Sequence, residues 1–256
     1  MAVVTFTSDF GSADAYAGAM KGVVLSLAPD AVLVDISHEI PRRDVAAGAL
    51  ALAQAVPYFP SGSVHVAVVD PGVGGERAGL VIEAGGRTFV GPDNGVLSLA
   101  TRSPRCVYRI DNPSFRREPV SPTFHGRDIF AVTAGRLARG SPAKEAGPPL
   151  PAIVELPAME DGPLAGECRS RVIHVDGFGN LVTSLCGGRT EGRWQLRCAN
   201  RRFELCGGRT FCDVAVGDLV LYEGSSGRIE IAMRDGSAVA RTGAQPGAVI
   251  ELRRLS

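Results

Sequence analysis

The chain has no excess of charge of either sign and no long apolar run. Its 27 lysines and arginines balance 27 aspartates and glutamates, so no net field draws it to nucleic acid or to an anionic membrane. No hydrophobic stretch approaches the roughly 18 residues that a membrane-spanning helix needs. Strand-like sequence begins at residue 2 or 3, which leaves no room for a signal peptide. We therefore expect a soluble cytoplasmic protein that binds neither nucleic acid nor membrane.

The sequence also lacks a CxxC pair, although it contains six cysteines, five of them after residue 165. Without such pairs a zinc site has little support. In a reducing compartment these cysteines are expected to be free thiols packed as small hydrophobic residues. The chain does have 256 residues, of which 45% are hydrophobic and 21% charged. This suffices for one large globular domain or two smaller ones.

The N-terminal part, up to about residue 145, alternates short β-branched runs with alanine-rich stretches. This alternation predicts an α/β domain whose mainly parallel central sheet is flanked by helices. The expected strands are Val3–Thr7, Val32–Ile36 and Val64–Val69, with a hairpin of Leu80–Glu83 and Thr88–Val90 around Gly85-Gly86. The expected helices are Asp14–Leu27, Val45–Val56 and Arg127–Leu137.

A proline-rich stretch that begins at Gly147 disfavours both helix and central strand. We therefore predict an N-terminal α/β domain over 1–146, a linker over 147–164 and a smaller C-terminal all-β, barrel-like domain over 165–256. Its expected strands are Arg171–Val175, Arg193–Cys198, Leu219–Tyr222, Ile229–Met233 and Ala248–Leu252. The hexapeptide LCGGRT occurs twice, at Leu185–Thr190 and Leu205–Thr210, and its glycines predict hairpin turns without chemistry.

The stretch Val66–Ala78, VAVVDPGVGGERA, carries the strongest chemical signal of the N-terminal part. A buried-strand pattern runs directly into Asp70, and a glycine-rich turn with Arg77 follows. Such a turn exposes backbone N–H groups and lets a ligand approach closely. An acid at the carboxyl end of a parallel strand is where open α/β sheets place their chemistry. A tight turn with a solvated Asp–Arg pair is the alternative.

Two other loops carry polar groups next to predicted elements. Asp9, in TSDFG, could accept both hydroxyls of a ribose, or it could cap the following helix. For Asp128, in TFHGRD, capping is the better interpretation. His125 lies in the same loop just before a helix, where the helix dipole favours neutral imidazole. His65, by contrast, falls inside a strand-like run and is expected to be an ordinary half-buried residue.

Two glycine turns of the C-terminal part could contact a ligand. Asp176-Gly-Phe-Gly-Asn180 offers a carboxylate, an aromatic face in Phe178 and the amide of Asn180. An amide can pair with the edge of adenine and a phenyl ring can cover its face. The alternative is a structural turn closed by a phenylalanine. Gly224-Ser225-Ser226-Gly227 could bind a small anion through its N–H and hydroxyl groups.

These motifs together resemble one family. The chain contains, in order, TSDFG, HEIPRRDV, VVDPGVGGER, GPDNG, FHGRDIFA and DGFGN, spread from Thr7 to about Gly236. This combination is similar to the S-adenosyl-L-methionine (SAM) hydrolases, also called SAM hydroxide adenosyltransferases, which are related to the fluorinase and chlorinase enzymes. The resemblance implies an α/β domain followed by a β domain, and a homotrimer that holds SAM between neighbouring subunits.

The resemblance also implies a reaction: attack of water or hydroxide at C5′ of the SAM ribose, which releases L-methionine and leaves adenosine. The catalytic set carries over onto Asp70, Arg77 and His125. Residues matching the substrate-binding positions are Asp9 at the ribose diol, Asp176 and Ser225 at the methionine end, Phe178 and Asn180 around the adenine, and Met233 and Asp235 nearby. No metal and no cofactor is needed, since SAM itself is the substrate.

Some positions depart from the family pattern. Arg43 stands where relatives usually have an aromatic residue, and Ser226 and Met233 stand near positions where the halogenases have arginines. The tyrosine of the halogenases is replaced here by Asp70. A carboxylate disfavours a halide nucleophile, because the anion has no proton to share with it.

Three alternative functions remain open from the sequence. A SAM-dependent halogenase of the same fold would make chlorinated adenosine from SAM and chloride. A non-catalytic SAM- or adenosine-binding protein would bind without turnover. A metal-dependent phosphohydrolase would use Asp9, Asp70, Asp93 and His125 and would be inhibited by a chelator.

Overall fold

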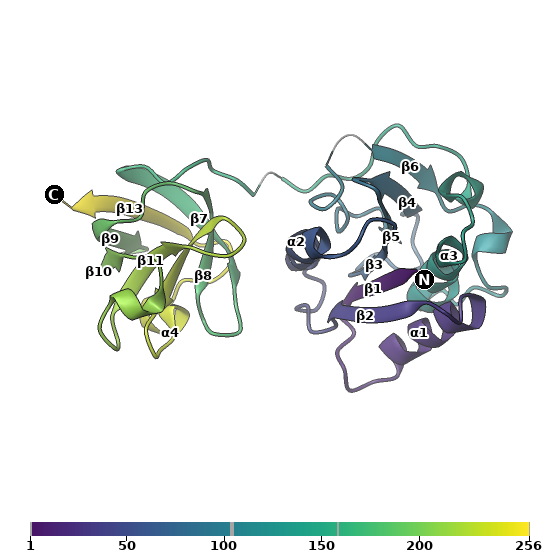
Figure 1. Ribbon diagram of the computed structural model, residues 1–256, viewed down its shortest axis with the longest axis horizontal. Helices are drawn as coiled ribbons and strands as arrows, with labels where there is room; N and C mark the ends of the chain where they lie inside the picture. The colour runs from purple at the N-terminus through teal and green to yellow at the C-terminus, as the bar shows by residue number, and fades with distance from the viewer. Residues whose placement is uncertain (1, 103–104, 158, 256) are drawn as a thin grey trace. The chain divides into compact units, whose positions relative to one another are not determined.

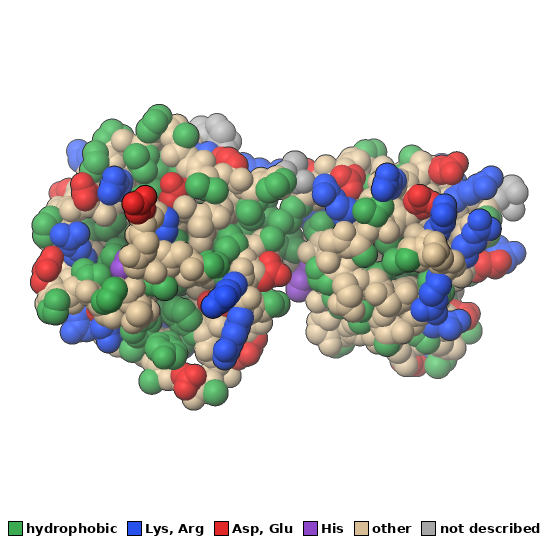
Figure 2. All heavy atoms as spheres, turned by 180° about the vertical axis from the view of Figure 1, so that it is seen from behind, with side chains coloured by type: hydrophobic (Ala, Val, Ile, Leu, Met, Phe, Trp, Pro, Cys, Tyr) green, Lys and Arg blue, Asp and Glu red, His purple; other side chains and the backbone are tan. Residues whose placement is uncertain are grey.

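The computed structural model describes residues 2–102, 105–157 and 159–255. The chain divides into two compact units, Met1–Leu156 and Pro157–Ser256, which are described separately below (Figure 1). The division lies inside segment 147–164, and Ala158 of that predicted linker lies outside the described residues. In the described ranges, no helix is long and apolar enough to cross a membrane. Figure 2 shows acidic and basic side chains interspersed on one face, as the balanced composition leads one to expect.

The first unit is built on a six-stranded sheet in the order β2-β1-β3-β5-β4-β6. β1, β2, β3 and β5 run parallel, and β4 runs against both of its neighbours. The predicted mainly parallel α/β domain is confirmed, and so is the hairpin around Gly85-Gly86. The strands are β1 (Val3–Ser8), β2 (Val32–Ser37), β3 (Val64–Val68), β4 (Gly79–Ala84), β5 (Arg87–Pro92) and β6 (Arg105–Arg109).

Helices cover both faces of this sheet (Figure 1). They are α1 (Tyr16–Leu27), α2 (Val45–Ala55) and α3 (Ala131–Ala138), with shorter helical turns at Val56–Tyr58, Pro113–Phe115, Gly126–Phe130 and Ala143–Ala146. Alternate side chains of β5 point to opposite faces. Val90 joins the core beneath α1 and α3, whereas Phe89 joins the core beneath α2. α2 begins where the Asp44 side chain accepts a hydrogen bond from Ala47 N.

His65, on β3, is fully buried rather than half-buried as its sequence context predicts. Its Nδ1 lies 2.8 Å from Thr5 Oγ1 on the neighbouring strand, and its ring stacks on Phe89. Nε2 is buried without a hydrogen-bond partner among the described residues. Burial, with a smaller contribution from the positive charge of Arg87, lowers the pKa of His65 to about 4. The imidazole is therefore neutral in the folded protein at pH 7.

We expect this histidine to make folding stability depend on pH. Between pH 6.5 and pH 4 the unfolded chain binds a proton at His65 and the folded chain does not, so stability falls as the pH falls. The shift from 6.5 to about 4 corresponds to about 3 kcal/mol lost by pH 4. Urea unfolding of the wild type and of His65→Gln at pH 6.5 and at pH 4 measures this loss in the free energy of unfolding. Equal losses of stability in the two proteins would contradict the expectation.

The second unit is a closed β-barrel in the order β10-β11-β12-β8-β7-β13-β9, with β9 pairing back onto β10. This confirms the predicted barrel-like domain. Its core surrounds Trp194, which is 1% exposed and whose Nε1 donates to Thr190 O. The elements are β7 (Glu167–Val175), β8 (Leu181–Cys186), β9 (Gly192–Cys198), β10 (Arg201–Gly207), β11 (Leu219–Glu223), β12 (Arg228–Met233), α4 (Ala238–Thr242) and β13 (Val249–Leu255), with a short helical turn at Phe211–Asp213.

The prediction that both LCGGRT segments form hairpin turns is wrong. Leu185–Thr190 leads from β8 to β9, which are not neighbours, and Leu205–Thr210 leads from β10 to β11, which pair in parallel. The two copies instead pack against each other. Thr190 Oγ1 donates to Gly208 O at 3.1 Å, and a Cβ at Gly207 would lie 1.5 Å from Thr190 O. Glycine is required at 207 because the two backbones touch there.

Candidate active site

The polar loops of the first unit emerge from adjacent strands of its sheet. β1 and β3 are parallel neighbours, with Ser8 opposite Val68. Asp9 follows directly after β1, and Asp70 follows two residues after β3. Both carboxylates therefore leave the sheet at the carboxyl edge, where α/β proteins place their ligands.

The side chains of Asp70, Arg77 and His125 are in direct contact. Arg77 Nε donates to Asp70 Oδ1 at 3.0 Å, and Arg77 Nη2 donates to Asp70 Oδ2. The same Nη2 lies 2.8 Å from His125 Nδ1. The fork is largely removed from solvent, since the Arg77 side chain is 12% exposed and that of Asp70 is 5% exposed. Three residues from two separate loops thus form one hydrogen-bonded set.

This geometry fixes the protonation of His125. A guanidinium has only donors, so Nδ1 must accept and the ring proton must reside on Nε2. Burial, followed by the positive charge of Arg77, holds the pKa of His125 below its usual value, although Asp70 and Asp128 oppose this. His125 is therefore a neutral imidazole at pH 7 whose Nε2–H can donate to a further group.

The glycine-rich turn fits closely against the loop that carries His125. Gly74 has a φ of +78°, and a Cβ there would lie 2.4 Å from Pro122 O. Only glycine allows both the conformation and the approach. Arg77 then extends over the ring of Phe130, with its Cζ 5.2 Å from the ring centroid. The closely packed glycine turn and the ring of Phe130 together hold the guanidinium in place.

Asp9 does not cap a helix. The N-cap position of α1 is Ala15, whereas Asp9 Oδ2 accepts a hydrogen bond of 2.9 Å from Arg43 N. Arg43 has a φ of +65°, a left-handed conformation that costs a non-glycine residue about 1 kcal/mol or more. This strained residue directs its N–H at the carboxylate. Within the described residues, Asp9 Oδ1 accepts no hydrogen bond.

The capping interpretation of Asp128 is also wrong. The residue before the helical turn is His125, and Asp128 lies inside that turn, 1% exposed. Its carboxylate accepts from Ser121 N at 2.9 Å and from Arg127 Nε at 2.7 Å. The loop before this helical turn folds back over it, and Ser121 N of that loop donates to the Asp128 carboxylate. The carboxylate is therefore used by the loop and does not cap the helix.

The GPDNG segment contains a positioning residue that reasoning from the residues missed. Asn94 Nδ2 donates to Val69 O at 2.8 Å, and Asn94 Oδ1 accepts from Val96 N. Asn94 therefore holds the backbone directly before Asp70. Asp93 accepts from Val154 N instead of facing the other acids, and within the described residues no three His, Cys, Asp or Glu side chains are grouped to hold a metal.

The predicted contacts of the second unit lie in loops between barrel strands. Asp176 and Asn180 bind each other, with Asn180 Nδ2 donating to Asp176 Oδ2 at 2.8 Å. Phe178, at the tip of this turn, is 81% exposed. This turn, between β7 and β8, packs on the loop between β12 and α4, since a Cβ at Gly179 would lie 2.2 Å from Ser237 Oγ. The structure thereby brings the Asp176 turn close to the loop that contains Asp235.

A further carboxylate that sequence reasoning missed is Glu230 on β12, which lies between Ser225 and Met233 in the sequence. Tyr222 Oη donates to Glu230 Oε2 at 2.7 Å. Burial raises the pKa of Glu230, the Tyr222 hydrogen bond opposes this rise, and the nearby charge of Asp176 adds to it. The signal in the sequence would have been a lone acid among the apolar residues 229–233 of β12.

Comparison with known proteins places these features in one family. Residues 4–147 match the family model described as the SAM hydroxide adenosyltransferase N-terminal domain, and residues 170–251 match its C-terminal domain. The chain is 40% identical over 250 residues to a protein of Salinispora arenicola named (R)-S-adenosyl-L-methionine hydrolase, covering 95% of each chain. A protein of Thermus thermophilus with the same name is 38% identical, over 98% of this chain and 100% of the relative.

Halogenase relatives and solved structures extend the comparison. A fluorinase of Actinoplanes is 27% identical over 90% of each chain. The crystal structure of an uncharacterised conserved protein from Thermotoga maritima has a TM-score of 0.90 and 29% identity, covering 99% of this chain and 100% of the other.

The fold and the relatives thus define an enzyme that joins a helix-flanked, mainly parallel sheet to a β-barrel. The chain belongs to the SAM hydroxide adenosyltransferase family.

Proposed function

We propose that this enzyme hydrolyses S-adenosyl-L-methionine to adenosine and L-methionine, with water as the nucleophile at C5′. The observation that carries the proposal is the contact of Arg77 with both Asp70 and His125. Relatives of 38–40% identity named as SAM hydrolases over nearly the whole chain support it. The catalytic residues would be Asp70, Arg77 and His125.

The difficulty of this reaction is the nucleophile, because the sulfonium of SAM is already a good leaving group. Lowering the pKa of water from about 15.7 to about 10 would take about 8 kcal/mol, at about 1.36 kcal/mol per unit. One guanidinium does not supply that much free energy, so Arg77, Asp70 and His125 share the activation of the water. Arg77 orients Asp70, whose remaining lone pairs accept a proton from the attacking water. His125 donates its Nε2–H to the same oxygen and fixes its direction.

The step balances without a metal or a cofactor. The water oxygen forms a bond to C5′ while the C5′–S bond breaks, and both electrons of that bond go to sulfur, which becomes the neutral thioether of methionine. One proton of the water passes to Asp70 and then to solvent. Holding the oxygen about 3 Å from C5′ and in line with sulfur is itself a large contribution to the rate.

A halide is a poor alternative nucleophile at this site. Chloride and fluoride have no proton to donate to Asp70, whereas water donates a proton to Asp70 and accepts a hydrogen bond from His125 Nε2–H. The fluorinase relatives are also more distant, at 27% identity against 38–40%.

We propose a homotrimer in the cytoplasm as the working state. The homotrimer rests on the family resemblance. The cytoplasm is consistent with six free cysteines, none of them in a disulfide among the described residues. Size-exclusion chromatography with light scattering measures the oligomer.

The function is tested by incubating the protein with SAM in chloride buffer, with and without a chelator, and identifying products by mass spectrometry. We expect adenosine and methionine in equal amounts, and the same rate with chelator. Chlorinated adenosine would indicate the halogenase, and binding without turnover over hours would indicate the non-catalytic protein. Either result would contradict the proposal.

Replacing Asp9 with alanine is expected to weaken adenosine binding at least about 100-fold. Two hydroxyls of the ribose would lose their charged acceptor, and hydrogen bonds to a charged group are worth about 1.5–3 kcal/mol each. Isothermal titration with adenosine measures the dissociation constant. Asp30→Ala, an exposed acid between α1 and β2, is the matched control and is expected to bind normally. An unaltered dissociation constant in Asp9→Ala would count against the assignment.

A further inference from the structure

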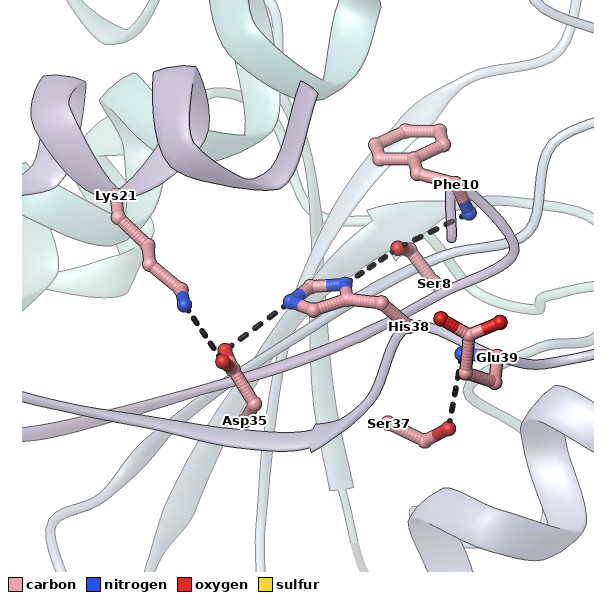
Figure 3. Close-up of polar contacts among 7 residues, drawn as sticks. All are labelled: Ser8, Phe10, Lys21, Asp35, Ser37, His38 and Glu39. Carbon is pink, nitrogen blue, oxygen red and sulfur yellow. Dashed lines mark hydrogen bonds and ion pairs between the residues drawn. The ribbon is translucent and has the colours of Figure 1, made fainter. Parts of the chain in front are cut away.

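Asp35, which is exposed, and the buried His38 and Ser8 form a chain of three side chains that ends next to Asp9 in the sequence (Figure 3). His38 Nε2 lies 3.1 Å from Asp35 Oδ1, and His38 Nδ1 lies 2.7 Å from Ser8 Oγ. Ser8 is 1% exposed and His38 is 9% exposed. Ser8 Oγ in turn accepts from Phe10 N at 3.4 Å. The chain thus runs from β2 to the backbone of the loop that carries Asp9.

The acid at one end fixes the direction of every hydrogen bond in this chain. Burial alone would raise the pKa of Asp35, but hydrogen bonds from Lys21 and His38 outweigh it and hold the pKa below its usual value. An ionised carboxylate accepts only, so a neutral His38 carries its proton on Nε2 and presents Nδ1 as an acceptor. The Ser8 hydroxyl therefore donates to His38, and its lone pairs face Phe10 N–H.

Backbone hydrogen bonds join the same two segments. Gly11 N donates to His38 O at 2.7 Å, and Ile40 N donates to Ser8 O at 3.3 Å. Arg43 N donates to the Asp9 carboxylate. The Asp9 loop is therefore held against the segment from His38 to Arg43 at Ser8, Asp9 and Gly11.

We propose that His38, oriented by Asp35, is a positioning residue that holds the Ser8 hydroxyl and thereby aims Asp9 at the ribose hydroxyls. The inference rests on the proposed function for the identity of the ligand. Ser8 is not a nucleophile, although acid, imidazole and hydroxyl are in series, because its side chain is buried and its oxygen accepts from Phe10 N. These three side chains take part in no bond-breaking step; they fix the direction of the Asp9 carboxylate.

The two nitrogens of His38 can be replaced separately. In His38→Asn the side-chain oxygen occupies the place of Nδ1 and can accept from Ser8. In His38→Gln the amide extends to the place of Nε2 and keeps the bond to Asp35 but loses Ser8. Ser8→Ala removes the hydroxyl with little change of volume. Ser37→Ala is the matched control, because Ser37 Oγ accepts from Glu39 N in the same segment outside the chain (Figure 3).

The readouts are KM and kcat for SAM, with the dissociation constant for adenosine. We expect His38→Gln and Ser8→Ala to raise KM and the adenosine dissociation constant about tenfold, because an unmade buried hydrogen bond frees the loop, while kcat changes less than about threefold. His38→Asn and Ser37→Ala are expected to stay within about twofold of the wild type. Normal KM in both Ser8→Ala and His38→Gln, or equal losses in His38→Asn and His38→Gln, would overturn the proposal.

A second readout separates this proposal from the proposed function. Hydrogen exchange of the Gly11 and Arg43 amides reports loop order without any ligand. We expect faster exchange of both amides in Ser8→Ala and His38→Gln than in the wild type and His38→Asn. Unchanged exchange in all variants would overturn the positioning role. Failure of the wild type to hydrolyse SAM would overturn the function alone, because the exchange result stands without substrate.

Discussion

Replacing Asp70 with asparagine is expected to lower kcat for SAM hydrolysis about 10³-fold, within the range of about 10²–10⁴ that a general base contributes. Asparagine keeps the shape of the side chain but cannot take a proton, and its amide would present N–H groups to the donors of Arg77. Binding of SAM should change little, within about threefold, because Asp70 acts on the water rather than on the adenosine.

Single-turnover measurements and equilibrium binding of SAM test this separation. Glu76→Gln is the matched control, since Glu76 is an exposed acid in the same turn and should leave both constants unchanged. The account would be contradicted if Asp70→Asn abolished binding while the rate per bound complex stayed at the wild-type value. Asp70 would then be a binding residue and not a base.

Replacing Arg77 with methionine is expected to cost activity and stability together. Asp70 would remain as a 5% exposed carboxylate without its partner, and breaking a buried pair from one side costs about 3–5 kcal/mol. Adenosine formation is expected to fall at least as far as in Asp70→Asn, because Asp70 and His125 both lose the group that orients them. The double variant Asp70→Asn with Arg77→Met should regain much of the stability and none of the activity.

Urea unfolding of the three variants measures the stability differences. Arg193→Met is the control, because the Arg193–Glu204 pair is 67% and 66% exposed and such pairs are worth about 0–1 kcal/mol. A loss below about 1 kcal/mol in Arg77→Met would show that the Asp70 charge is solvated or neutral without Arg77, and the account of a water-excluded fork would be wrong.

The parts of the fold that the sequence predicted are those with a strong local signal. Glycines 85 and 86 between two β-branched runs define the β4–β5 hairpin, and alanine-rich stretches define α1 and α2. β6 was missed because its sequence, RCVYR, is short, begins and ends with arginine and lies at the edge of the sheet. The barrel strands β8 and β10 were missed because glycine motifs at their ends resemble turns, and pairing between distant strands overrides that local signal.

The candidate site was predictable as a set of loops but not as a geometry. Asp9 and Asp70 follow strand patterns, and parallel strands bring such positions together. The hydrogen bond between Arg77 and His125 joins residues 48 positions apart in the sequence, and the spacing of hydrophobic residues does not predict such a contact. The roles of Asn94 and His38 depend on backbone atoms and on a buried imidazole tautomer, which the residue types alone do not specify.

In the proposed reaction a water oxygen becomes the 5′ oxygen of adenosine. Running the reaction in ¹⁸O-labelled water and analysing both products by mass spectrometry tests it directly. We expect one ¹⁸O atom in the 5′-hydroxyl of adenosine and none in methionine, because SAM has no oxygen at C5′ and the new bond forms there. Unlabelled adenosine, or label in the methionine, would contradict attack by water at this carbon.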